Sequence, residues 1–155
     1  MTSVLVILAL VALDQLSKFL VVAHIKGTPG ISVLGSFFRL IYLENTGAAF
    51  GILQDSRSFF IVITLVVSAV LIYELFIKKP KSAFLKWALV FIFAGTLGNF
   101  IDRLRLHYVV DFISLTFGSY SFAVFNLADT FIVVGTFMVL LHIFFQEEQS
   151  EHSRG

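Results

Sequence analysis

Four apolar stretches, each long enough to cross a lipid bilayer, make up about half of this chain of 155 residues. They cover residues 4–23, 59–77, 83–101 and 124–145. A spanning helix needs about 20 consecutive, mostly apolar residues. Hydrocarbon offers no water to pair with the backbone, so each stretch has to satisfy its own N–H and C=O groups and is expected to be a helix. The sequence therefore predicts four transmembrane helices.

The composition favours a bilayer over water as the solvent. Hydrophobic residues make up 58% of the chain and charged residues 14%, whereas soluble domains are about half apolar and about a quarter charged. A water-soluble bundle of very apolar helices is the alternative, and it would have too few polar residues to cover its surface. We predict an all-α membrane protein with one membrane-embedded domain, residues 1–145, followed by a polar, disordered tail, residues 146–155.

The first stretch has a second interpretation, as a cleaved signal sequence. It lacks a basic segment at its start, Asp14 and Lys18 interrupt its apolar run, and no small-x-small cleavage site follows it. These features are atypical of signal peptides. We therefore interpret it as a retained helix.

The four helices place both termini on one side of the membrane, together with the short link 78–82. Lys and Arg residues are equally numerous on the two sides. Three lysines, however, fall within the four residues 78–81 of this short link, and short loops near span ends are where the positive-inside bias operates. The sequence thus predicts cytoplasmic termini, with the longer connections 24–58 and 102–123 outside.

The first outer connection is expected to contain a small β-sheet. Its segments 31–34 and 37–43 are rich in β-branched and aromatic residues, and Gly35 and Ser36 lie between them. This pattern is typical of a hairpin, which would rest on the membrane surface. The small residues from Gly47 to Gly51 would let another backbone approach closely.

Ionisable side chains within spans are costly, so each one suggests a function. Asp14 and Lys18 lie four residues apart on one helical face and are expected to pair. The pair would be either a neutralised structural strut or part of a site. Asn99 shares a face with Asp102 and with Arg103 at the end of the third span. Ordinary helix-end polarity and support of a site are both open for this group.

Asp111 and Asp129 are the candidate reactive pair. Asp111 lies in an apolar run of the second outer connection, and Asp129 lies 18 positions later, three residues after Asn126 and five after Val124. This spacing predicts Asp129 roughly 7–8 Å inside the fourth span. Two neighbouring carboxylates share a proton over a wide pH range. One can then activate a water while the other polarises a carbonyl, without a metal or cofactor. A proton-coupled transporter would use the same pair as a relay, so both functions remain open, with hydrolysis favoured.

Other chemistries have little support in the sequence. The chain has no cysteine, no HExxH motif and four scattered histidines, so we expect no metal site. Neither a GxSxG motif nor a glycine-rich phosphate loop is present. No basic stripe suggests nucleic acid.

The polar residues fall into five ordered motifs that together resemble the lipoprotein signal peptidase (signal peptidase II) family of bacterial membrane proteins. These motifs are Asp14-Gln-Leu-Ser-Lys18, Asn45-Thr-Gly-Ala-Ala-Phe-Gly51, Gly98-Asn-Phe-Ile-Asp-Arg103, Val109-Val-Asp-Phe112 and Phe125-Asn-Leu-Ala-Asp129. One departure is visible, because Ala94-Gly95 stands where the family has a Gly-Gly pair.

The resemblance implies an aspartyl endopeptidase with Asp111 and Asp129 as its catalytic dyad. Such an enzyme removes the signal peptide from prolipoproteins just before a diacylglyceryl-modified cysteine, at the outer face of the bacterial plasma membrane. The family has four spans and cytoplasmic termini, its surface sheet cradles the substrate, and the cyclic peptide globomycin inhibits it at the dyad. The residues expected to position substrate or support the dyad are Asn45, Gly47, Asn99, Asp102, Arg103 and Asn126, with Asp14 and Lys18 supporting the fold or the site.

Substrate, membrane lipid and globomycin are the implied partners, and we expect a monomer because all active residues come from one chain. Transport would predict inverted repeats and broken helices, and the sequence shows neither. A noncatalytic assembly factor is a third possibility, which would tolerate neutralisation of both aspartates.

Overall fold

The computed structural model describes residues 1–47, 53–54 and 56–152, with side chains described as far as Gln146. Its helices are α1 (Thr2–His24), α2 (Arg57–Ile72), the π-helical continuation η2 (Tyr73–Lys78), α3 (Ala83–Arg105) and α4 (Leu127–His152). Its strands are β1 (Ile31–Leu34), β2 (Phe38–Asn45), β3 (Val109–Phe117) and β4 (Tyr120–Ser121). The strands therefore lie in the two connections predicted to be outside.

Four helices are long and apolar enough to cross a membrane, which confirms the predicted spans. Two bounds of the fourth span differ from the prediction. The helix begins at Leu127 rather than at residue 124, and it continues to His152. The tail predicted to be disordered is thus helical as far as that residue, because Gln and Glu are good helix formers that can extend a helix beyond its apolar part.

Small residues bring α3 and α4 into close contact. A Cβ atom at Gly95 would collide with the backbone oxygen of Ala128, and one at Gly135 would lie 2.6 Å from the backbone oxygen of Ala88. Glycine at such positions lets helix backbones approach in a membrane, where packing rather than the hydrophobic effect holds helices together. The opposite side of α3 packs against α1 and α2 around the buried Val90 and Phe93.

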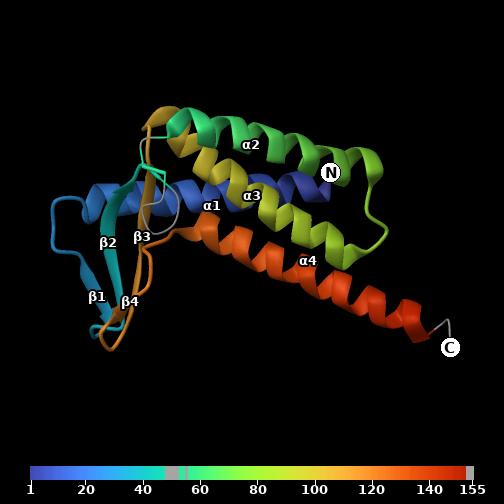
Figure 1. Cartoon of the computed structure of the whole chain (residues 1–155). Helices are drawn as coiled ribbons and strands as arrows, with labels where there is room; N and C mark the ends of the chain where they lie inside the picture. The colour runs from blue at the N-terminus through green and yellow to red at the C-terminus, as the bar shows by residue number, and fades with distance from the viewer. Residues whose placement is uncertain (48–52, 55, 153–155) are drawn as a thin grey trace.

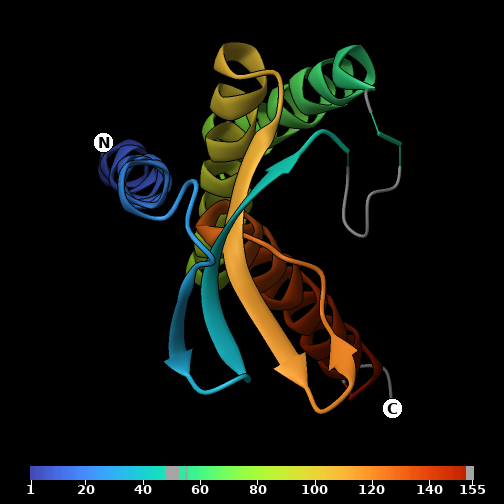
Figure 2. The same ribbon diagram turned by 90° about the vertical axis from the view of Figure 1, so that its left-hand side faces the viewer.

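The strands form one antiparallel sheet in the order β1-β2-β3-β4. The predicted hairpin is present, and the glycine and serine between its strands form the turn. The prediction missed β3 and β4, which come from the second connection and fold back at Gly118, a residue with φ +61. Figure 2 shows β2 and β3 side by side across the end of the helices.

The two ends of the molecule contain different parts of the chain. The start of α1, the end of α4 and the connection between η2 and α3 lie at one end, and the sheet lies at the other (Figure 1). This arrangement is the one expected from an even number of spans. It also places the polar motifs where the sheet meets the helices.

Candidate active site

Asn126 and Asp129 form reciprocal hydrogen bonds at the start of α4. The Asp129 backbone N–H donates to Asn126 Oδ1 at 3.0 Å, and the Asn126 backbone N–H donates to Asp129 Oδ2 at 3.1 Å. This reciprocal pattern is a capping box, which satisfies N–H groups that a helix leaves unpaired at its start. Asp129 therefore lies in the first helical turn. The prediction that it lies deep in the span is wrong, because the helix starts three residues later than the apolar pattern does.

Asp111 lies on β3 and is held by two side-chain amides. Asn45 Nδ2 donates to its Oδ2 at 2.7 Å, and Asn126 Nδ2 donates to its Oδ1 at 2.6 Å. Asp111 is 1% exposed. Asn126, the capping residue of α4, thus contacts both Asp111 and Asp129. These two aspartates, which we call the acid pair, therefore belong to one hydrogen-bonded group.

Asn99 on α3 connects the acid pair to a buried cation. Its Oδ1 accepts from Lys18 Nζ at 3.0 Å and from Asn126 Nδ2 at 3.1 Å, while its Nδ2 donates to Asp129 Oδ1 at 2.7 Å. Since an ammonium group can only donate, Lys18 orients the carbonyl side of this amide. The NH2 group is thereby directed to Asp129.

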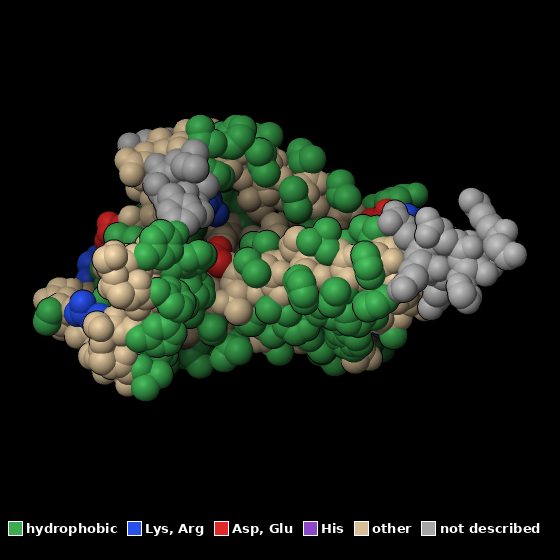
Figure 3. Space-filling model, turned by 60° about the horizontal axis from the view of Figure 1, so that its bottom comes forward, with side chains coloured by type: hydrophobic (Ala, Val, Ile, Leu, Met, Phe, Trp, Pro, Cys, Tyr) green, Lys and Arg blue, Asp and Glu red, His purple; other side chains and the backbone are tan. Residues whose placement is uncertain are grey.

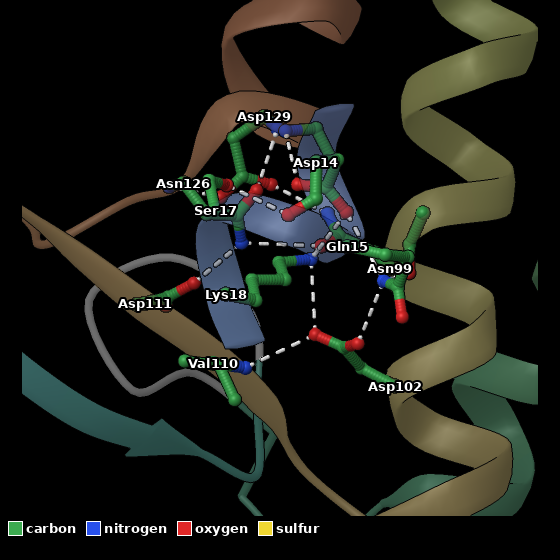
Figure 4. A network of polar contacts seen from close by, with 12 residues as sticks. Asp14, Gln15, Ser17, Lys18, Asn99, Asp102, Val110, Asp111, Asn126 and Asp129 are labelled. Atoms are coloured by element: carbon green, nitrogen blue, oxygen red, sulfur yellow. Dashed lines mark hydrogen bonds and ion pairs between the residues drawn. The ribbon is translucent and has the colours of Figure 1, made fainter. Parts of the chain in front are cut away.

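Lys18 also joins two further aspartates into a buried charged strut, composed of Asp14, Lys18 and Asp102. Its Nζ lies 2.9 Å from Asp14 Oδ2 and 2.9 Å from Asp102 Oδ2. The predicted pairing of Asp14 with Lys18 is confirmed. In Figure 4 the lysine points between the two carboxylates, with Asn99 beside it. Its three contacts match its three donor hydrogens.

The strut ties four elements together through backbone groups. The backbone N–H of Ala128 in α4 donates to Asp14 Oδ1 at 3.0 Å, and that of Val110 in β3 donates to Asp102 Oδ2 at 3.2 Å. Asp14 lies on α1 and Asp102 on α3. The strut therefore positions the two segments that carry the acid pair.

Gln15, which was not among the predicted site residues, completes the strut. Its Nε2 donates to Asp102 Oδ1 at 2.9 Å and contacts Asp14 Oδ2 at 3.2 Å. The signal available was a neutral amide inside an apolar span, directly beside an aspartate. Gly98 supplies the room, because a Cβ at this position would lie 2.6 Å from Asp14 Oδ2.

Arg103 lies on the side of the site where α2 begins. It donates to the backbone oxygen of Gly47 at 3.1 Å and lies 4.6 Å from the centre of the Phe60 ring. Arg57, a second residue that the sequence analysis did not single out, donates to the backbone oxygens of Arg103 and Leu104 at 3.0 and 3.2 Å. These contacts join the end of α3 to the start of α2. The small residues expected after Gly47 lie outside the described residues.

A cavity of about 600 Å³ opens onto the acid pair. Its walls are mostly apolar and come from α2, α3, α4 and the segment 122–125; Val67 on α2 and Ile132 on α4 are two of the apolar residues. Figure 3 shows a hollow between hydrophobic rims, with acidic and basic side chains visible inside it. Six of the ten predicted site residues line the cavity: Asn45, Gly47, Asn99, Arg103, Asp111 and Asp129. The strut residues lie behind it, and Asn126 connects the two groups.

The surroundings of Asp111 favour its protonated form. Burial, followed by the negative charge of Asp129, raises the pKa of Asp111 to about 6, although hydrogen bonds from Asn45 and Asn126 act in the opposite direction. A carboxyl group whose pKa lies closer to neutral than that of an ordinary aspartate exchanges its proton more readily near neutral pH, as a member of an acid–base catalytic pair must. The geometry thus supports water activation beside a polarised carbonyl.

Comparison with known proteins agrees with this chemistry. The family model described as signal peptidase (SPase) II matches residues 6–145. A lipoprotein signal peptidase from Caldanaerobacter subterraneus subsp. tengcongensis is 46% identical over 137 residues, which cover 88% of this chain and 92% of the relative. A lipoprotein signal peptidase from Streptococcus pyogenes serotype M1 is 45% identical, covering 94% of each chain.

Two solved structures have a similar fold. A bacterial membrane enzyme determined by the in meso method at 2.3 Å resolution has a TM-score of 0.89 and 32% identity, covering 96% of this chain and 90% of its own. A second such structure at 1.9 Å has a TM-score of 0.82 and 33% identity, covering 92% of each chain. Nothing in these relatives supports the transporter alternative. The chain is a multi-pass membrane protease that belongs to the signal peptidase II family.

Proposed function

We propose that this protein removes the signal peptide from diacylglyceryl-modified prolipoproteins, with Asp111 and Asp129 as its catalytic dyad. One observation carries the assignment of the dyad: these two aspartates line the same cavity and are linked through a single amide side chain, Asn126. The family and its named relatives, which are lipoprotein signal peptidases, support the reaction.

The dyad would work with one proton shared between its members. The raised pKa of Asp111 favours this residue as the holder of the proton, and in that state it would donate a hydrogen bond to the scissile carbonyl. Asp129, as the ionised member, accepts a proton from the attacking water. The hydroxide oxygen bonds to the carbonyl carbon and forms a tetrahedral intermediate. Collapse of this intermediate breaks the C–N bond, and the proton now on Asp129 passes to the leaving amine.

Neutral amides suit this task better than cations would. Asn45 and Asn126 hold Asp111 by hydrogen bonds, and Asn99 holds Asp129. These contacts fix the direction of each carboxyl group without adding a positive charge that would ionise both aspartates. Arg103, which lines the same cavity, would donate to substrate carbonyl groups.

The lateral position of the cavity fits a substrate held in the membrane. Val67 on α2 and Ile132 on α4 are among its apolar walls, where an acyl chain or the apolar part of a signal peptide loses no water contacts on entry. We assign the termini and the lysine-rich link 78–82 to the cytoplasm and the acid pair to the outer face of the plasma membrane. All of these side chains come from one chain, which is consistent with a working monomer.

The test is cleavage of a purified diacylglyceryl-modified prolipoprotein by the detergent-solubilised protein. The wild type should release the signal peptide, globomycin should block the release, and a chelator should leave it unchanged. Asp111→Asn and Asp129→Asn should be folded and inactive. Glu74→Gln serves as the matched control, because this acid pairs with Lys78 far from the cavity. A folded wild type that cuts no such substrate would overturn the proposal, and full activity in either asparagine variant would overturn the dyad.

A further inference from the structure

A β-bulge in β2 decides which side chain faces Asp111. Leu40 pairs with Ile113, and the next pair is Leu43 with Asp111. The step between these two pairs is therefore three residues along β2 but only two residues along β3. An extra residue of this kind re-aims the side chains that follow it. Residues directly opposite each other in an antiparallel pair point to the same face of the sheet.

The alternation of side chains shows what the bulge changes. With the bulge, Leu43 and Asn45 share the face of Asp111, and the Asn45 amide reaches its carboxyl group at 2.7 Å. In an unbulged strand the period of two would continue from Leu40 and would put Glu44 on that face. A third carboxylate would then replace an amide donor beside the acid pair.

A polar clasp lies on the opposite face of β2, beside the bulge. It consists of Lys26, Tyr42, Glu44 and Tyr108. Tyr42 Oη donates to Glu44 Oε1 at 2.6 Å, and Lys26 Nζ donates to Tyr42 Oη at 3.1 Å and to Glu44 Oε1 at 3.0 Å. The Tyr42 hydroxyl also lies 3.0 Å from that of Tyr108. One hydroxyl therefore joins the segment just after α1, the strand β2 and the residue just before β3.

The segment before β1, which belongs to the same connection, packs closely against the bulge. Gly30, with φ +85, has so little space that a Cβ would lie 2.5 Å from the backbone oxygen of Leu40 and 2.9 Å from the Ile41 side chain. Arg39, just before the bulge, donates to the backbone oxygen of Pro29 at 2.7 Å. The bulged residues are thus held by contacts on the strand and by the loop that backs it.

We propose that the clasp of Lys26, Tyr42, Glu44 and Tyr108 is a positioning device, which holds the β2 bulge so that Asn45 rather than Glu44 faces Asp111. These residues touch neither Asp111 nor Asp129 and act through the Asn45 amide. The inference rests on the proposed function, because it assigns the clasp a part in tuning the catalytic acid.

The direction of the effect follows from the Asn45 hydrogen bond. This bond stabilises the ionised carboxylate and lowers the pKa of Asp111, against burial and Asp129, which raise it. Weakening the clasp should let the amide move away, so the pKa of Asp111 should rise further. The other charged groups that act on Asp111 are Arg103 and Lys18, and the clasp contacts neither.

The test is Tyr42→Phe, which removes the shared hydroxyl but keeps the ring. We expect kcat to fall about two- to tenfold, as for the loss of one net hydrogen bond, with KM little changed. The pH at which Asp111 titrates should rise by roughly 0.5 to 1 unit. Tyr120→Phe is the matched control, since this exposed tyrosine lies on the same sheet away from the clasp, and it should leave both values unchanged.

A double-variant cycle separates positioning from general stability. Asn45→Ala should shift the titration in the same direction, and Tyr42→Phe should add little in its presence, because both changes act through one hydrogen bond. Lys26→Gln, a milder loss from the clasp, should give a smaller shift of the same sign. A drop in activity without a shift, or shifts that add fully in the double variant, would overturn the inference.

The titration can be read without turnover. Infrared spectroscopy against pH detects the protonated carboxyl band, and its loss in Asp111→Asn assigns the band to that residue. If the wild type cut no prolipoprotein, the proposed function would fail while this measurement still tested the clasp. If the wild type cut normally and Tyr42→Phe left the band unmoved, the clasp alone would be refuted.

Discussion

Asp14 and Asp102 differ from Asp111 and Asp129 in what holds them, although all four lie at the same end of the helices. In the charged strut, Lys18 contacts both carboxylates at 2.9 Å. In the acid pair, every side chain among the described residues that forms a hydrogen bond to a carboxyl group is a neutral amide. Among the described residues, the acid pair lines the cavity and the strut does not.

The contrast shows what makes an aspartate available for chemistry in an apolar protein. In the strut, both carboxylates contact one lysine and accept from backbone N–H groups of α4 and β3, so the strut is committed to holding these elements together. Amides orient the acid pair without direct contact with a cation, while Arg103 and Lys18 act on Asp111 only from a distance. Asn99 joins the two groups because it accepts from Lys18 and donates to Asp129.

The comparison is tested most directly by neutralising one residue of the acid pair and, separately, one residue of the charged strut. Asp111→Asn should lower turnover at least about a thousandfold, since a catalytic proton carrier is lost, which corresponds to about 4 kcal/mol. The same variant should keep most of its unfolding temperature, because it loses one of the two hydrogen bonds from Asn45 and Asn126 but also the repulsion between the buried Asp111 and the half-buried Asp129. Cleavage rates and thermal unfolding in detergent measure the two effects. A marked loss of stability would assign Asp111 to structure instead.

Lys18→Met should affect stability most. It leaves two buried carboxylates without their cation, which costs about 3–5 kcal/mol. Thermal unfolding should show a large decrease. The triple variant Asp14→Asn, Lys18→Met, Asp102→Asn should recover much of the loss, because no uncompensated charge remains. If the triple variant were no more stable than Lys18→Met, charge balance would not be the role of the lysine.

Gly98→Ala tests whether the strut needs its close packing. The new Cβ would lie 2.6 Å from Asp14 Oδ2 and 3.1 Å from Ala128 Cβ, so unfolding should become easier by about 1–3 kcal/mol. Gly135→Ala has a comparable clash with Ala88 but lies away from the strut. Both should lose stability, and Gly98→Ala alone should also lose activity per folded molecule. Equal activities would mean that the strut does not transmit to the acid pair.

The smallest effect expected is a change in the pH dependence of stability. Asp111 has a folded pKa of about 6 against an ordinary value of 3.8, so the folded state binds the extra proton between these values. Stability should therefore fall as pH rises from about 4 to about 6. Asp129→Asn removes the second cause of the raised pKa and should reduce this fall by about 1 kcal/mol. Unfolding temperatures across this range give the slope, and Asp111→Asn provides the reference from which this contribution is absent.

Much of this architecture was predictable because its signals are local. Apolar length predicted the four spans, a spacing of four predicted the pairing of Asp14 with Lys18, and turn residues predicted the hairpin. The motifs also brought together the residues that surround the cavity. In each case the pattern lies within one short segment of sequence.

What the sequence did not predict depends on contacts between distant segments. The strand β3 pairs with β2, which lies about 70 residues earlier in the chain. By themselves, the residues of β3 show only an apolar run. The depth of Asp129 was wrong because Asn126 caps the helix, and a hydropathy pattern does not register caps. The bulge that turns Asn45 toward Asp111 depends on register, which two separate strands set together.

The position of the cavity beside α2 and α4 has a consequence for inhibitors. Both helices are long and apolar enough to cross a membrane, so a molecule that entered between them would come from the lipid, and its effective concentration would be the one in the bilayer. Each methylene that it buries there adds about 0.8 kcal/mol to partitioning, and two methylenes raise that concentration more than tenfold without any new contact with the protein. Potency measured in water would therefore rank compounds by their lipid solubility as well as by their fit. Comparing inhibitors at equal mole fraction in the membrane would separate the two.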